Sequence, residues 1–262
     1  MLKCRTLGLL DITCGDRPAT PSAPKVRQVL ALLIARRNEL VPIPDIAAEL
    51  WEGSPPRSAT ATVQTYIYQL RKLLEGDDPA DAGTGPLLTK SSGYLLRLAP
   101  GECDEEEFDG LSALGRTALR QGDARAAADL LGAALALWTG PPLADVGQGR
   151  MLQAHALRLQ ERRMHTMELR ISADLHLGLH RELVGELKEL ACAHPLHEWF
   201  QGGLIIALQR CGRRGEALQV YQRLREVLRD ELGLDPSPGL QRIQQRVLTD
   251  QVTAADLSLL AG

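Results

Sequence analysis

The chain has 262 residues, of which 44% are hydrophobic and 24% are charged, and its net charge is −3. This composition is typical of a globular protein, and the length suggests two ordinary domains. The longest apolar run, residues 29–35, is far shorter than the roughly 20 residues of a membrane-spanning helix. Because the N-terminus also lacks a signal-peptide pattern, we expect a cytoplasmic protein with no membrane partner.

Five cysteines are scattered along the chain, with no CxxC pair and no Cys/His cluster at zinc-ligand spacing. They indicate reduced packing residues, so we expect no disulfide, no metal and no cofactor. His176 and His180 have i, i+4 spacing, but Gly178 lies between them and no third ligand is apparent. The motifs GxxxxGK[ST], GxGxxG, HExxH and GxSxG are absent from the sequence, and we therefore do not expect an enzyme.

The first elements predicted are a sheet and two helices. Residues 2–20 alternate in short apolar and polar steps, with Gly8 and Gly15 as punctuation, which predicts a small antiparallel sheet. The strongly apolar residues 26–37 predict a first helix. Residues 42–51 predict a short second helix, in which Pro44 or Asp45 opens the first turn.

The most informative stretch is residues 51–74, in which a Pro-Pro bend is followed by a helix-start signal at Ser58. Residues 59–74 contain no Asp, Glu, Gly or Pro, so this third helix suits an anionic partner. Apolar residues at helical spacing form one buried stripe: Val63, Ile67, Leu70 and Leu74. The opposite face carries amides, hydroxyls and cations, which read base edges and hold phosphates in DNA complexes.

A hairpin is predicted after the third helix. A polar, glycine-rich loop at residues 76–86 leads into residues 87–98, which predict strand, turn and strand. Three helices followed by a hairpin that bears Lys90 and Arg97 predict a winged helix. In such a domain the third helix enters the major groove and the hairpin reaches the adjacent DNA backbone.

Two sets of DNA contacts follow from this arrangement. The predicted base-reading residues lie on the third helix: Thr60, Gln64, Thr65, Tyr68 and Gln69. The predicted phosphate contacts lie at the helix ends and on the hairpin: Arg57, Arg71, Lys72, Lys90, Ser91 and Tyr94. The charge distribution agrees, because residues 1–98 carry 12 basic and 10 acidic side chains, a net of +2, whereas residues 99–262 carry 18 and 23, a net of −5.

The second half of the chain is predicted to be helical. A break after the hairpin predicts a winged-helix domain at residues 1–99, a helical domain at 104–250 and a C-terminal tail at 251–262. Gly122, Gly178 and Gly212 each precede small or apolar residues at positions +5 and +9, and the last two glycines are 34 residues apart, the tetratricopeptide period. An insertion containing residues 138–146 interrupts this array. The alternative is an unrelated helical bundle.

The expected fold is therefore mainly α. An N-terminal winged helix-turn-helix, with a small antiparallel sheet and a C-terminal hairpin, precedes an all-α tetratricopeptide-like repeat domain. We expect the helical domain to pack on the winged helix and to offer a protein-binding surface. A fragment ending near Pro100 is expected to keep much of the specific DNA affinity of one protomer.

Several segments resemble the Streptomyces antibiotic regulatory proteins (SARPs), in which an OmpR-type winged helix precedes a bacterial transcriptional activation domain. They occur in family order at residues 7–12, 24–36, 48–74, 91–96, 136–146, 212–228 and 231–243. The resemblance implies an activator of a secondary-metabolite (antibiotic) gene cluster, associated with the nucleoid. It also implies binding to tandem direct repeats of double-stranded promoter DNA near the −35 element, with a second protomer alongside, and recruitment of RNA polymerase holoenzyme.

The resemblance further implies that the loop between the second and third helices is a transactivation loop: Trp51, Glu52, Gly53, Ser54, Pro55 and Pro56. Within it, the residues themselves favour Trp51 as a core anchor. Arg71 or Lys72 alternatively faces RNA polymerase. A function of another class also fits the residues, namely a tetratricopeptide-type adaptor whose winged helix contacts only proteins.

Overall fold

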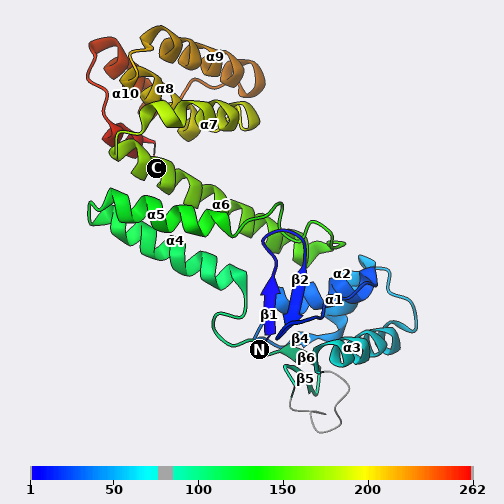
Figure 1. Cartoon of the computed structure of the whole chain (residues 1–262). Coiled ribbons are helices and arrows are strands. Elements are labelled where there is room, and N and C mark those ends of the chain that lie inside the picture. Colours follow the sequence, from blue (N-terminus) through cyan, green and yellow to red (C-terminus); the bar gives the residue numbers. More distant parts are fainter. Residues whose placement is uncertain (1, 76–84, 261–262) are drawn as a thin grey trace. The chain divides into compact units, whose positions relative to one another are not determined.

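The computed structural model describes residues 2–75 and 85–260. The first elements are β1 (Leu2–Arg5), β2 (Asp11–Cys14), β3 (Arg17–Pro18), α1 (Pro24–Ala35), β4 (Val41–Pro42), α2 (Ile43–Trp51), α3 (Ala59–Glu75), β5 (Leu87–Lys90) and β6 (Gly93–Leu96). The later elements are α4 (Asp104–Arg120), α5 (Ala124–Ala136), α6 (Arg150–His176), α7 (His180–Ala193), α8 (Glu198–Arg210), α9 (Arg214–Leu232), α10 (Pro238–Thr249) and the 3-10 helix η2 (Ala254–Leu259) (Figure 1). Of the loop predicted at residues 76–86, residues 76–84 lie outside the described residues.

The chain divides into two compact units. Unit 1 comprises Met1–Leu111 and Ala134–Met164, and unit 2 comprises Ser112–Ala133 and His165–Gly262. The domain limits expected from the sequence stay a prediction. Within the described part of the chain, no helix combines the length and the apolarity that crossing a membrane requires.

Unit 1 contains two small antiparallel sheets. The first has the strand order β1-β2-β3, which confirms the sheet predicted at residues 2–20. The second has the order β4-β6-β5 and adds β4 to the predicted hairpin. Gly93 permits this pairing, since a Cβ atom there would lie 2.1 Å from the Val41 carbonyl oxygen. A strand of two residues, Val41–Pro42, carries too short a pattern to be predicted.

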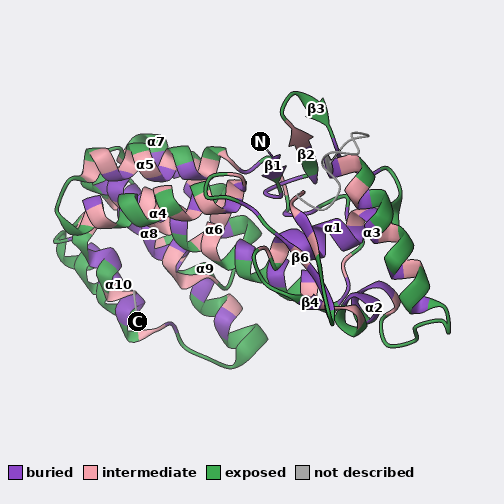
Figure 2. Ribbon diagram, turned by 90° about the horizontal axis from the view of Figure 1, so that it is seen from below, coloured by how far each residue is buried: buried purple, intermediate pink, exposed green. Residues whose placement is uncertain are grey.

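The three predicted helices of the winged helix are confirmed as α1, α2 and α3. Pro24 opens α1, at a position where the missing N–H costs no helix hydrogen bond, and most of α1 is buried (Figure 2). Beyond its end, the Asn38 amide donates to the Leu98 carbonyl oxygen and accepts from the Leu98 N–H, each at 3.0 Å. The stripe predicted on α3 is confirmed, because its four side chains, Val63, Ile67, Leu70 and Leu74, are 0, 1, 0 and 6% exposed.

Residues beyond 100 complete the core of unit 1. Cys103, Leu143, Val146 and Leu152 belong to the same hydrophobic cluster as the buried side chains of α1, α2 and α3. The insertion after α5 also pairs with the chain after β1, because the N–H groups of Thr139, Leu143 and Ala144 donate to the carbonyl oxygens of residues 7, 6 and 8 at 2.9, 3.1 and 3.1 Å. The predicted insertion thus packs on the winged helix, within unit 1.

The glycine turns predicted for the helical repeat lie in unit 2. Gly122, Gly178 and Gly212 have φ angles of 82, 83 and 75° and follow α4, α6 and α8. Glycine adopts this left-handed region without the penalty that a Cβ atom brings. The residues at positions +5 and +9 are at most 5% exposed: Ala127, Leu131, Leu183, Leu187, Ala217 and Tyr221. The predicted tetratricopeptide-like repeat, in which a glycine turn joins two helices, is therefore confirmed.

Candidate DNA-binding site

The side of α3 opposite its buried stripe is polar and exposed. The structure places every predicted base-reading side chain there: Thr60, Gln64, Thr65, Tyr68 and Gln69. Tyr68 leaves 69% of its surface in solvent although it is aromatic. The Thr65 hydroxyl donates to the Ala61 carbonyl oxygen at 3.0 Å, so its own proton is satisfied within the helix and its lone pairs face outward. This surface offers both donors and acceptors, as base reading requires.

Four residues of the predicted phosphate set lie before α3, in its last turn or on the hairpin. Arg57 precedes α3, Lys72 lies in its last turn, and Lys90 and Ser91 lie at the tip of the hairpin; all four side chains are exposed. From Ala59 to Leu74 the helix itself contributes no acidic residue. A local positive potential of this kind attracts phosphate irrespective of the net charge of the chain.

Arg71 differs from its predicted position. Its Nε and Nη2 atoms donate to the Leu87 carbonyl oxygen at 3.3 and 3.4 Å, and Nη2 also donates to the Thr89 hydroxyl at 2.5 Å. Both acceptors lie on β5, so the guanidinium joins α3 to the wing. The phosphate contact of Arg71 stays a prediction, although two of its three guanidinium nitrogens already donate to the wing.

Tyr94 also differs from its predicted position. It is only 5% exposed, and its ring belongs to the hydrophobic cluster of unit 1. It lies opposite Thr89 in the β5–β6 pair and opposite Val41 in the β4–β6 pair. Its ring thus packs inside the domain and not on the surface of the wing.

Arg17 also supports this site, although no pattern in the sequence predicts its role. Its Nη2 atom donates to the Leu73 carbonyl oxygen at 2.7 Å, from a position 56 residues earlier in the chain. A cation is favoured at the C-terminal turn of a helix, where carbonyl groups lack helical partners. Arg17 therefore stabilises the end of α3 from the N-terminal sheet.

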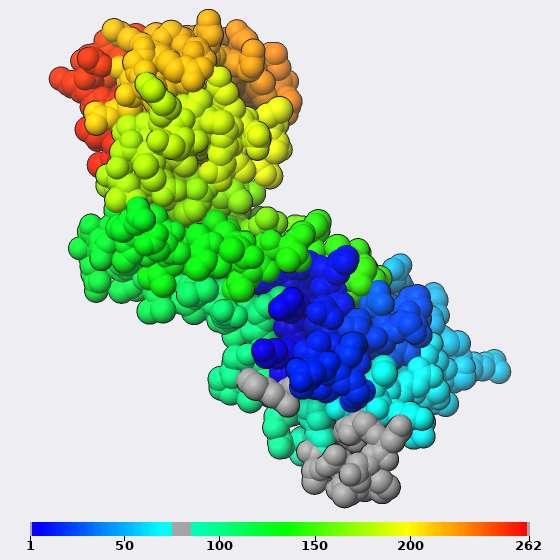
Figure 3. All heavy atoms as spheres, in the orientation of Figure 1, coloured from blue at the N-terminus to red at the C-terminus, as the bar shows by residue number. Residues whose placement is uncertain are grey.

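The predicted transactivation loop is exposed from Glu52 to Pro56, and this segment projects from the surface (Figure 3). Glu52 and Gly53 have φ angles of 48 and 90°, which turn the chain away from the axis of α2. Trp51 ends α2 and packs partly against the core of unit 1, as the sequence favoured. The remaining residues of the loop are therefore accessible to a partner.

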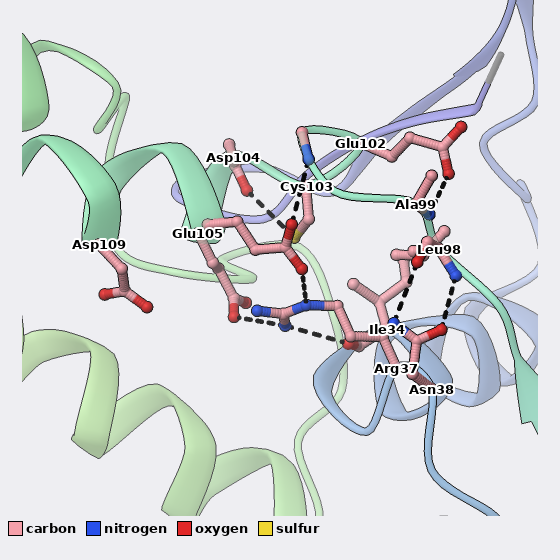
Figure 4. Close-up of polar contacts among 12 residues, drawn as sticks. Ile34, Arg37, Asn38, Leu98, Ala99, Glu102, Cys103, Asp104, Glu105 and Asp109 are labelled. Carbon is pink, nitrogen blue, oxygen red and sulfur yellow. Dashed lines mark hydrogen bonds and ion pairs between the residues drawn. The ribbon is translucent and has the colours of Figure 1, made fainter.

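A buried ionic network joins α1 to α4 in unit 1. The Glu105 carboxylate, 1% exposed, accepts from the Thr6 hydroxyl and from Arg37 Nη1, each at 3.0 Å, and lies 2.9 Å from His155 Nε2. Figure 4 shows Arg37 at the end of α1 facing the first turn of α4. Burial alone would raise the pKa of Glu105, but His155 and Arg37 together lower it below its ordinary value.

Glu49 provides a second link inside unit 1. Its carboxylate is 2% exposed and accepts from the N–H groups of Met151 at 2.7 Å and Leu152 at 3.2 Å, in the first turn of α6. These N–H groups have no partner within the helix, and the helix dipole favours a negative charge there. Gly149 allows the approach, since a Cβ atom would lie 2.3 Å from the Glu49 carbonyl oxygen. The first turn of α6 is thereby fixed to α2.

Two cysteines of this unit, Cys4 and Cys103, are not reactive thiols. Cys4 and Cys103 are buried on neighbouring backbone segments and are not bonded to one another. Burial raises the pKa of Cys103 to about 12, and that of Cys4 is raised as well, so both thiols stay protonated at neutral pH. Among the described residues, no group of His, Cys, Asp and Glu has the arrangement of a metal site.

An exposed polar helix, a wing at its side and a following helical repeat define a winged-helix transcriptional regulator. Residues 103–248 match the family described as the bacterial transcriptional activator domain, and residues 19–96 match the C-terminal domain of transcriptional regulatory proteins. The chain belongs to the SARP family of transcriptional activators. The members of this family that it matches are regulatory proteins and transcriptional regulators.

The similarity extends over both halves of the chain. The regulatory protein DnrI of Streptomyces peucetius is 38% identical over 250 residues, which are 94% of this chain and 92% of DnrI. The regulatory protein AfsR of Streptomyces coelicolor is 42% identical over 245 residues, which are 93% of this chain but only 24% of AfsR. Among solved structures, Mycobacterium tuberculosis EmbR in complex with a low affinity phosphopeptide has a TM-score of 0.90 and 32% identity, over 99% of this chain and 68% of EmbR.

Proposed function

We propose that the protein is a sequence-specific DNA-binding activator of a secondary-metabolite gene cluster. The observation that carries this proposal is the exposed face of α3, with its amides and hydroxyls and no acidic side chain between Ala59 and Leu74. Membership of the SARP family supports binding to tandem direct repeats near the −35 element, by two protomers side by side, and recruitment of RNA polymerase. The protein would then act on the nucleoid.

The proposed recognition divides between two kinds of contact. Glutamine side chains can pair with the N6 and N7 positions of adenine in the major groove, which favours Gln64 and Gln69 as base readers. The cations around them hold the backbone and fix the orientation of the helix without reading sequence. Specificity and total affinity should therefore respond to different substitutions.

Replacing Gln69 by alanine should weaken binding to cognate DNA by about 1–3 kcal/mol and change binding to random DNA far less. Both affinities are measured by gel shift with a duplex that the wild-type chain selects from a random-sequence pool, and with an unselected duplex. Gln222→Ala is the matched control, because Gln222 is an exposed glutamine of α9. Equal losses on the two duplexes would rule out base reading by Gln69.

Replacing Lys90 by alanine should weaken binding to every sequence and lower the log–log salt slope by about one unit, because one phosphate contact is lost. The affinity is measured from low to physiological salt on both duplexes. Arg181→Ala, which removes an exposed cation of α7, should leave the slope unchanged. If the wild-type chain did not bind DNA, or if its binding did not depend on salt, the alternative function of a protein-interaction adaptor would be favoured.

A further inference from the structure

We infer that Arg71 is a positioning residue, which holds the wing in place against the recognition helix and does not itself contact phosphate. The inference rests on the proposed function, because a positioning role has a measurable effect only if α3 and the wing bind DNA together. It assigns to Arg71 a role that differs from those of Lys72 and Lys90, although the three are similar cations in the sequence.

The first support is the geometry of the guanidinium. β5 is an edge strand, since it pairs with β6 on one side only within the order β4-β6-β5. Backbone groups on the free edge of a strand have no ladder partner. Arg71 donates to one of them, the Leu87 carbonyl oxygen, and also to the Thr89 hydroxyl two residues further along. A planar guanidinium holds its donors in a fixed arrangement that suits both acceptors, whereas lysine has no donor at the position of Nε and carries its rotatable ammonium on a flexible stem.

The second support is the place of Thr89 next to the predicted phosphate contact. Leu87 is 2% exposed and anchors one end of β5 in the core. The other end is exposed from Thr89 to the turn, and Lys90 pairs with Gly93 directly beside that turn. The bond to Thr89 therefore ties the outer half of the strand to α3. It fixes the separation between Lys90 and the base-reading side chains.

The third support is electrostatic. The two acceptors of Arg71 are a carbonyl and a hydroxyl, which are uncharged, so its positive charge is not neutralised by an ion pair with them. The charge still adds to the potential around α3, while the donors are committed to the wing. Charge and geometry can therefore be separated by substitution, because Arg71→Lys keeps the charge and loses the fork.

A preorganised wing should lower the cost of binding, since fewer degrees of freedom are lost when α3 and Lys90 engage DNA at once. The affinity of the full chain for the selected duplex is measured across salt for Arg71→Ala, Arg71→Lys and Lys90→Ala, and for each Arg71 variant combined with Lys90→Ala. Arg71→Ala and Arg71→Lys should each weaken binding about threefold to tenfold, the range expected for lost hydrogen bonds. When it is combined with either Arg71 variant, Lys90→Ala should weaken binding less than it does in the wild-type chain, because Arg71 no longer holds the wing against α3.

A variant of the acceptor tests the same link without touching a charge. Thr89→Val removes the hydroxyl that Arg71 binds and keeps the shape of the side chain, and it should reproduce part of the loss seen with Arg71→Ala. Thr89→Ser keeps the hydroxyl and should bind as the wild-type chain does. Because Thr89 is exposed, neither change should disturb folding, which thermal unfolding checks.

The outcomes separate this inference from the proposed function. If Arg71→Lys bound as wild type, and if Arg71→Ala and Lys90→Ala each lowered the salt slope by about one unit with additive losses, Arg71 would be a phosphate contact. The inference would then be wrong and the proposed function would stand. If the wild-type chain selected no duplex from the pool, the proposed function would fail, and the inference with it.

Discussion

Replacement of Glu105 by alanine is expected to lower the free energy of unfolding by about 3–5 kcal/mol, the usual effect of removing one partner from a buried ion pair. The carboxylate accepts from Thr6 and Arg37 and contacts His155. Arg37 is itself mostly buried, with 18% of its side chain exposed, and would keep its bonds to Glu106 and to the Ile34 carbonyl oxygen but lose its buried carboxylate partner. Urea unfolding of the full chain measures the change.

The same turn of α4 supplies a matched control. Glu107 is an exposed acidic residue at a similar distance from the start of the helix, so Glu107→Ala loses a similar dipole interaction and no buried partner. Its effect should stay within about 0.5 kcal/mol. Comparable losses in the two variants would show that the charge of the first turn matters and the buried network does not.

The stabilisation by Glu105 should also depend on pH. Its pKa is lowered from an ordinary value of 4.5 in the folded protein, so folding favours the charged form. The contribution is therefore fully present above the unfolded pKa and is lost as the pH falls through the folded pKa. The difference in stability between the wild-type chain and Glu105→Gln should therefore be constant near neutral pH and shrink as the pH falls below 4.5. A difference that did not shrink would contradict the ionic role.

The parts of the fold that the sequence predicts are those with local signals. The stripe of α3 repeats within four turns, and the proline pair and Ser58 mark where that helix begins. The hairpin has its turn residues between two apolar runs. Each repeat turn has a glycine whose positive φ no other residue adopts as readily. These features depend on neighbours in the chain, so a pattern is sufficient to find them.

The partners of individual side chains could not be predicted, because they depend on how distant segments pack. The partner of Arg17 is 56 residues away and that of Glu49 is 102 residues away. Arg71 shows the consequence for the site. Its spacing places it among the exposed cations, whereas the acceptors on β5 bring its guanidinium to the wing. A pattern predicts which side of a helix faces outward and not which side chains are already bonded there.

A fragment ending at Pro100 is expected not to form a stable winged helix, which reverses the expectation from the sequence. The deletion removes Leu143, Val146 and Leu152 from the hydrophobic cluster that contains the stripe of α3. Loss of one buried leucine typically costs about 2–5 kcal/mol, and the whole stability of a domain is about 5–15 kcal/mol. The deletion also removes Glu105 and with it the main buried partner of Arg37.

The fragment is compared with the full chain by thermal unfolding and by footprinting on the selected duplex. Leu143→Ala and Leu152→Ala in the full chain serve as milder versions of the deletion, and each should destabilise unit 1 by about 2–5 kcal/mol. A fragment that unfolds cooperatively and protects the site as the full chain does would show that the residues beyond 100 are dispensable for the winged helix.

If the fragment does not fold, its failure to activate transcription says nothing about polymerase contacts. The predicted transactivation loop must then be tested in the full chain, where Glu52 and Pro55 are exposed and belong to no core cluster. Substitution of both by alanine should preserve the protected DNA site and reduce transcription in a single-round assay. Because Glu49 fixes the end of α2 to the start of α6, only such surface changes separate activation from folding.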